Sequence, residues 1–113
     1  MGAAAERLDL TLSALADPTR RRVVELLREA PRRPAELATA LGASRPAMSK
    51  HLRVLRNGGL VSESTLPEDA RVRVYRLEPA PFEELGAWLD AIEALWAEQL
   101  DAFAAHVAKR GGS

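Results

Sequence analysis

Basic and small polar side chains are gathered over residues 44–56, and their types suit hydrogen bonding to nucleic acid. Guanidinium and ammonium groups donate to guanine O6 and N7, a serine hydroxyl bonds to a base or a phosphate, and an alanine methyl group touches a thymine methyl group. Cations further along such a helix are better placed for phosphates, which give affinity without sequence information. The residues predicted to contact DNA here are Ser44, Arg45, Pro46, Ala47, Ser49, Lys50, His51, Arg53 and Arg56.

One member of this set, His51, has two interpretations. Met48, Leu52 and Leu55 form an apolar stripe at helical spacing in the same segment. Because His51 lies at the edge of that stripe, a hydrogen-bonded structural histidine is as consistent with the pattern as a phosphate contact.

Two short helices joined by a tight turn, over residues 34–58, would position these side chains. The first helix, starting at Pro34, buries Leu37, Ala38 and Leu41 on one face. Gly42 tolerates the positive φ that a sharp reversal needs, and Ser44 is suited to cap the second helix. This spacing is typical of a helix-turn-helix, whose second helix, predicted here over residues 45–57, enters the major groove.

A β-hairpin is predicted immediately after this segment, over residues 60–77. Its strands, 60–65 and 71–77, are rich in β-branched residues and are separated by a five-residue loop, 66–70. A hairpin in this place is a wing. Arg71 and Arg73 at its base are predicted to contact DNA, whereas the carboxylates of Glu68 and Asp69 at its tip would be repelled by phosphates.

Helices are predicted at both ends of the chain, over residues 4–16 and 81–109. The second carries an apolar stripe of seven positions, more than one small domain needs to bury. The stripe predicts a dimer surface made from both terminal helices, and the alternative is packing of the last helix on the first within one chain. The predicted interface residues are Leu8, Leu12, Leu85, Leu89, Ile92, Trp96, Leu100 and Phe103.

Another helix is predicted to begin at Asp17-Pro18, where Asp17 can cap it and proline suits its first position. In its first turn Arg21 can reach Glu25 at i+4. The sequence favours an ion pair of Arg21 with Glu25 over a phosphate contact.

Length and charge support the same reading. The 113 residues suit one domain, 1–113, which the pattern predicts to be mainly α with a small β-hairpin wing. The net charge is zero, but residues 18–78 hold 13 basic and 7 acidic side chains, a balance of +6, and the flanking segments balance this at −6. A basic centre between acidic ends is typical of a DNA-facing module with a separate interaction surface.

Several function classes are excluded by composition. The chain has no cysteine, which removes disulfides and thiolate metal sites, and its two histidines lie on different helices with no glycine-rich phosphate loop. We therefore expect no enzyme activity and no cofactor. No apolar run is long enough to cross a membrane and no secretory signal precedes the first helix, so a cytoplasmic location is expected.

The order of these elements resembles the ArsR family of bacterial winged-helix repressors. The resemblance lies in residues 15–27, 36–61 and 75–77, most specifically in 44–55, and the last helix is similar over 88–100 to members that lack metal sites. It implies a winged helix-turn-helix that dimerises through its N- and C-terminal helices and binds double-stranded DNA at a palindromic operator, usually as a repressor. The alternative is a winged-helix module that binds another protein without specific DNA binding.

The family's metal sites are missing from this chain. A C-x-C pair at the start of the first helix of the helix-turn-helix is replaced here by residues 33–35, Arg-Pro-Ala. The last helix has one histidine, His106, and neither half of the family's second metal pattern. No metal is therefore expected. The inducing signal stays open among a small molecule in a dimer-interface cleft, a protein partner, and autoregulation without an inducer.

Overall fold

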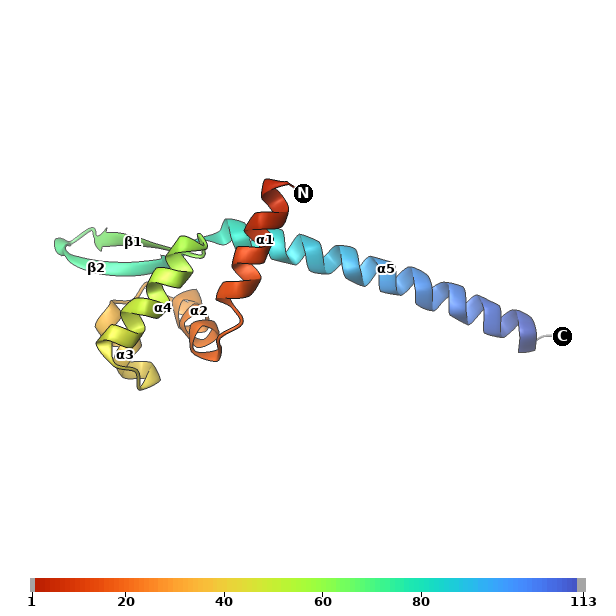
Figure 1. Ribbon diagram of the computed structural model, residues 1–113, viewed down its shortest axis with the longest axis horizontal. Helices are drawn as coiled ribbons and strands as arrows, with labels where there is room; N and C mark the ends of the chain where they lie inside the picture. The colour runs from red at the N-terminus through yellow and green to blue at the C-terminus, as the bar shows by residue number, and fades with distance from the viewer. Residues whose placement is uncertain (1, 112–113) are drawn as a thin grey trace. The chain divides into compact units, whose positions relative to one another are not determined.

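The computed structural model describes residues 2–111, and the chain divides into two compact units, one reaching to Phe82 and one beginning at Glu83. In chain order the elements are α1 (Ala3–Ala14), α2 (Pro18–Glu29), α3 (Pro34–Leu41), α4 (Arg45–Asn57), β1 (Val61–Leu66), β2 (Asp69–Leu77) and α5 (Pro79–Gly111), as Figure 1 shows. The mainly helical fold with a two-stranded wing is therefore confirmed.

Capping residues fix where the helices that carry the site begin. Asp17 caps α2, its carboxylate accepting from the backbone N–H of Arg20 at 3.1 Å, and Pro18 occupies the first turn. Ser44 caps α4, its hydroxyl oxygen accepting from the backbone N–H of Ala47 at 3.2 Å. Each cap satisfies a backbone donor that the first turn would otherwise leave unpaired.

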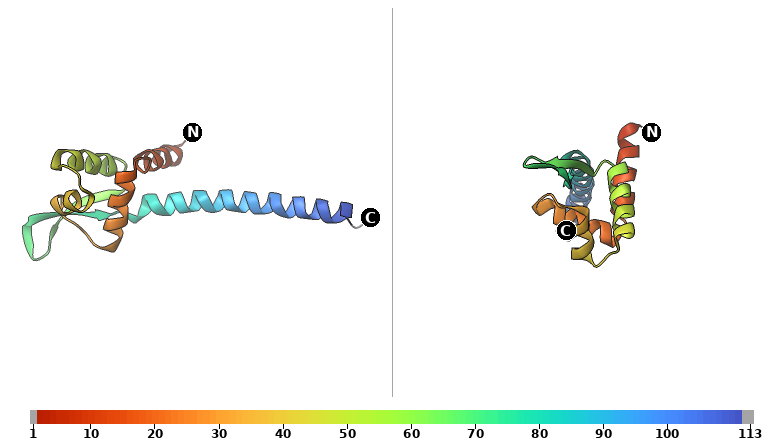
Figure 2. Two further views of the ribbon diagram at one scale, coloured as in Figure 1. Left: turned by 90° about the horizontal axis from the view of Figure 1, so that it is seen from below. Right: turned by 90° about the vertical axis from the view of Figure 1, so that its left-hand side faces the viewer.

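Gly42 makes the turn between α3 and α4. It adopts φ 63°, in the left-handed region that glycine enters without the steric cost of a Cβ. The backbone N–H of Ala43 then donates to the carbonyl of Ala38 at 3.0 Å, which ends α3. Both views of Figure 2 show α3 and α4 side by side, in the arrangement that the sequence predicts.

One apolar core joins α2, α3, α4 and the base of the wing. The predicted stripe of α4 is confirmed, because Met48, Leu52 and Leu55 are all fully buried. Since these three residues face inward, the basic side chains between them are directed outward. The other core residues are Ala14, Val23, Leu27, Leu37, Ala38, Leu60 and Val61.

On α1 the buried face is formed by small residues and not by the leucines predicted for the dimer interface. Thr11 and Ala14 are buried, whereas Leu8 is half-buried and Leu12 is 39% exposed. The Thr11 hydroxyl donates to the carbonyl of Arg7 at 3.0 Å, which allows this polar side chain to be buried. The leucines predicted for the dimer interface thus lie outside the buried face of α1.

The wing is a two-stranded antiparallel hairpin, but its loop is shorter than predicted. The strands are connected by two residues, Pro67 and Glu68, rather than five, and the register shifts between Thr65 and Leu66. At the base, Arg32 pairs with Tyr75 through backbone hydrogen bonds of 3.2 and 2.8 Å. This bridge fixes the segment before α3 against β2.

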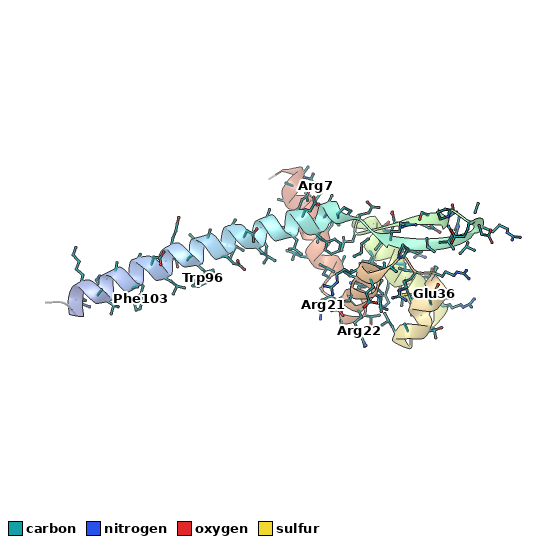
Figure 3. All side chains as sticks on the ribbon, turned by 180° about the vertical axis from the view of Figure 1, so that it is seen from behind. Arg7, Arg21, Arg22, Glu36, Trp96 and Phe103 are labelled. Carbon is teal, nitrogen blue, oxygen red and sulfur yellow. The ribbon has the colours of Figure 1, made fainter. Side chains whose placement is uncertain are left out.

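Helix α5 is 33 residues long and begins two residues earlier than predicted. Its large apolar side chains are exposed over most of its length, from Leu89 at 45% to Phe103 at 67%. Figure 3 shows two of them, Trp96 and Phe103, as sticks on α5. Leu85 and Ile92, also predicted to be interface residues, are partly buried.

Candidate nucleic-acid interface

The outward face of α4 carries most of the residues that the sequence predicts to contact DNA. Arg45, Pro46, Ser49, Lys50 and Arg53 are all exposed. Ala47 is half-buried and Ser44 acts as the cap of the helix. The structure thus brings three cations together on one exposed helix face, with their backbone fixed by the buried stripe.

His51 lies in a different environment from these cations. Its side chain is only 22% exposed, and its Nδ1 lies 3.4 Å from Nη1 of Arg20 and 4.0 Å from a carboxylate oxygen of Asp17. A guanidinium group can only donate, so Nδ1 of His51 is the acceptor in a hydrogen bond with Arg20. These contacts favour the structural interpretation of His51.

Arg20, which the sequence pattern did not single out, connects three helices. Its Nε donates to the carbonyl of Ala14 at 2.6 Å and its Nη2 to that of Ser13 at 3.4 Å, so that it satisfies carbonyls at the end of α1. Its neighbour Arg21 donates to the carbonyl of Leu15 at 2.7 Å, instead of forming the predicted pair with Glu25. The arginine-rich first turn of α2 therefore holds α1 in place.

Glu63 on β1 binds two of the predicted DNA contacts at once. Its carboxylate oxygens lie 3.0 Å from Nη1 of Arg56, at the end of α4, and 3.0 Å from Nη1 of Arg73, on β2. The Glu63 side chain is only 21% exposed, while those of Arg56 and Arg73 are 52% and 74% exposed. One half-buried carboxylate thus links the recognition helix to the wing.

A second pair lies near the wing turn, where the structure places Arg71, and not at the base of the wing as predicted. Nε of Arg71 is 3.2 Å from a carboxylate oxygen of Asp69, which also accepts from the backbone N–H of Arg71 at 3.0 Å. These hydrogen bonds, the backbone one foremost, lower the pKa of Asp69 below its ordinary value. Because Arg71 neutralises it, Asp69 repels a phosphate less than the sequence alone suggests.

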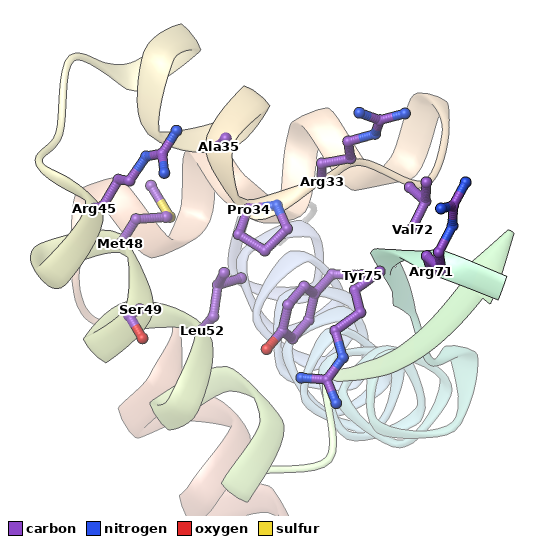
Figure 4. A pocket seen from close by; sticks show the side chains of 11 residues that line it. Arg33, Pro34, Ala35, Arg45, Met48, Ser49, Leu52, Arg71, Val72 and Tyr75 are labelled. Carbon is purple, nitrogen blue, oxygen red and sulfur yellow. The ribbon is translucent and has the colours of Figure 1, made fainter. Parts of the chain in front are cut away.

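Between α4 and the wing lies a groove of about 500 Å³, the α4–wing groove (Figure 4). The apolar part of its lining consists of Pro34 at the start of α3, Met48 and Leu52 on α4, and Val72 and Tyr75 on β2. The polar part is dominated by arginines from three segments. The remaining lining residues are Arg33, Ala35, Arg45, Ser49, Arg71 and Arg73.

Comparisons with known proteins decide the family. Residues 17–63 match the family described as "Bacterial regulatory protein, arsR family". The chain is 40% identical over 103 residues to the HTH-type transcriptional regulator Rv2034 of Mycobacterium tuberculosis, covering 91% of each chain. The chain belongs to the ArsR family. As an ArsR-family protein it is a DNA-binding transcriptional regulator and not an enzyme.

Solved structures of ArsR-like proteins have the same architecture. An ArsR-like transcriptional regulator from Rhodococcus sp. RHA1 has a TM-score of 0.75 and 31% identity, with 90% of this chain and 93% of that chain covered. A homodimeric winged helix-turn-helix DNA-binding domain from Mycobacterium bovis has a TM-score of 0.62 and 26% identity, with 82% and 85% covered. The winged helix-turn-helix fold of this ArsR-family chain is therefore confirmed.

Two further properties of this ArsR-family chain concern metals and membranes. Over residues 2–111, histidine, aspartate and glutamate side chains form no group of three that could hold a metal ion. None of the helices described over the same residues is long and apolar enough to cross a membrane.

Proposed function

We propose that this ArsR-family regulator is a homodimeric repressor that binds a palindromic operator with α4 in the major groove. The observation that carries the proposal is the exposed face of α4, where Arg45, Ser49 and Lys50 precede Arg53 on a helix with a buried opposite side. Recognition helices contact base edges with their N-terminal residues. We therefore assign Arg45, Pro46, Ala47, Ser49 and Lys50 to base edges.

Phosphate contacts are assigned to the remaining cations. Arg53 is exposed on α4, and Arg56, Arg71 and Arg73 are exposed around the wing, although each of these three is paired with a carboxylate in the free protein. Ser44 serves this face as the cap of α4. His51 serves it by fixing α4 against Arg20.

The dimer is proposed from the exposed apolar residues of α5. Trp96, Leu100 and Phe103 are 58%, 62% and 67% exposed, and such a continuous apolar face is typical of a protein interface. The exposed Leu12 and half-buried Leu8 add apolar surface on α1. A homodimer of this kind, acting on bacterial DNA, would work in the cytoplasm.

Two measurements test the proposal. Light scattering after size exclusion should give twice the mass of one chain for the wild type and for Ala94→Glu, on the opposite face of α5, but one chain mass for a Trp96→Glu/Leu100→Glu variant. Selection from random duplexes should enrich inverted repeats whose half-sites lie about 10–10.5 base pairs apart, or a multiple of that.

An Arg45→Gln/Lys50→Gln variant should lose the sequence preference and keep weak non-specific binding. If the wild type enriches no inverted repeat, the proposal is contradicted and a protein-interaction module is favoured. A reporter gene behind the selected site should be repressed by the wild type, and activation would contradict the assignment as a repressor.

A further inference from the structure

We propose that the α4–wing groove binds a small organic anion with a flat apolar body, such as an aromatic carboxylate, and that this ligand and DNA exclude each other. The first part stands on the groove alone. The second part rests on the proposed DNA face.

The positive charge of the groove suits an anionic ligand. Arg33, Arg45, Arg71 and Arg73 line its rim, from the segment before α3, from α4 and from β2. Arg33 is only loosely paired, with its Nε 3.8 Å from a carboxylate oxygen of Glu36. Planar guanidinium groups suit a carboxylate because they can donate to both of its oxygens.

The apolar lining of the groove suits a ligand with an apolar body. The half-buried Pro34, Val72 and Tyr75 offer the apolar surface of the groove, and Met48 and Leu52, each 1% exposed, lie behind it on α4. A phosphodiester strand would use the arginines but would gain nothing from this apolar surface. The volume of about 500 Å³ and the mainly apolar lining with a few convergent polar groups are typical of small-molecule sites.

Mutual exclusion follows from shared residues. Arg45, Ser49, Arg71 and Arg73 line the groove and also belong to the proposed DNA face. A carboxylate bound to these cations prevents them from contacting bases and phosphates. A bound DNA strand in turn prevents them from contacting the carboxylate. The coupling is therefore negative and equal in both directions.

The experiment uses 2-naphthoate as the probe and the ¹⁵N-labelled full chain without DNA. Saturable shifts should appear at the backbone amides of Ala35, Ser49 and Val72, and the uncharged 2-naphthalenemethanol and inorganic phosphate should each bind more weakly. Arg33→Gln should raise the Kd of 2-naphthoate at least about fivefold, as expected for a lost charge-assisted hydrogen bond. The control, Arg28→Gln, removes an exposed cation of α2 outside the groove and should leave the Kd unchanged.

Each other outcome overturns the proposal. Shifts that do not saturate, shifts centred outside the groove, equal binding of the uncharged alcohol, or equal binding of phosphate alone would each refute an organic-anion site. Groove shifts produced by duplex DNA but not by 2-naphthoate would show that the groove serves the DNA strand only. If 2-naphthoate binds the groove but does not weaken binding to the selected operator, mutual exclusion is refuted. Ligand binding is measured without DNA. A failed operator selection would therefore contradict the proposed function but would not affect the ligand-binding result.

Discussion

Replacing Glu63 by glutamine is expected to tighten non-specific binding to duplex DNA and to steepen its dependence on salt. In the free protein the Glu63 carboxylate holds both Arg56 and Arg73 at 3.0 Å. A phosphate that binds either arginine must compete with this carboxylate. Glutamine keeps the size and one acceptor oxygen but removes the charge, so both guanidinium groups become available.

The magnitude follows from the two ion pairs. Each exposed pair is worth about 0.2–1 kcal/mol, so releasing both should tighten binding by about 2- to 30-fold at low salt. Each phosphate neutralised adds about 0.9 to the slope of log K against log salt concentration, so the slope should steepen by up to about 1.8. The gain concerns phosphates and should be alike for all sequences, so the ratio of specific to non-specific affinity should stay constant.

Fluorescence anisotropy with a labelled non-specific duplex at several salt concentrations measures both quantities. Glu68→Gln is the matched control, because it also removes one carboxylate from the hairpin. Among the residues that the structure describes, Glu68 forms no ion pair. This control should change the slope much less. An unchanged slope for Glu63→Gln would show that Arg56 and Arg73 do not reach phosphates, and weaker binding would show that Glu63 instead orients them; either result refutes the reasoning.

Three predictions concern stability, measured by urea unfolding at a fixed protein concentration. Leu55→Ala should lower the free energy of unfolding by about 2–5 kcal/mol, and Val54→Ala, at a position that is 37% exposed, by less than about 1 kcal/mol; equal losses would refute the core assignment. Gly42→Ala should cost about 1–2 kcal/mol because of its left-handed backbone, whereas Gly86→Ala, where a Cβ meets no atom within 4 Å, should stabilise by about 0.5–1 kcal/mol. The backbone hydrogen bond from α2 lowers the pKa of Asp17 below 3.8, so its carboxylate stabilises the fold above that pH and this stability is lost as the pH falls through the lower, folded pKa. Asn caps equally well, so the stability difference between wild type and Asp17→Asn should shrink below pH 3.8; a difference independent of pH would refute the linkage.

The helix-turn-helix could be predicted because its determinants are local. Gly42 marks the reversal between the two helices, Ser44 caps the next helix, and Met48, Leu52 and Leu55 fix which side of it is buried. Each signal acts within one or two helical turns. The outward residues of α4, which we propose to face DNA, follow from that burial.

The two ion pairs of Glu63 differ in how far the sequence could predict them. A five-residue loop would pair Thr65 with Arg71 and therefore place Glu63 directly opposite Arg73, whereas the structure pairs Thr65 with Arg73 and places Glu63 and Arg73 on a diagonal. A shift of two residues leaves each side chain on its predicted face, so this pair is within reach in both registers. The pair with Arg56 depends instead on how the end of α4 meets β1, which no sequence spacing records.

Contacts between distant segments were missed for a similar reason. The bonds of Arg20 to Ala14 and His51 depend on how three helices meet, which no sequence spacing records. The burial of Thr11 on α1 reflects the same limit. Hydrophobicity gives no reason to bury a threonine, but its hydroxyl is satisfied within its own helix, so the small side chain can pack in the core of the first unit.

Arg73 belongs both to the Glu63 pair and to the α4–wing groove, so Glu63→Gln also tests how DNA and the proposed ligand share the site. DNA can gain from both released arginines, but a ligand in the groove gains only from Arg73, because Arg56 does not line it. The variant should therefore tighten DNA binding by more than it tightens 2-naphthoate binding. It should also require a higher 2-naphthoate concentration to release non-specific DNA, as anisotropy competition would show. A variant that becomes easier to displace would mean that the ligand draws more from Arg73 than DNA draws from both arginines, and the proposed division of the cations would then be wrong.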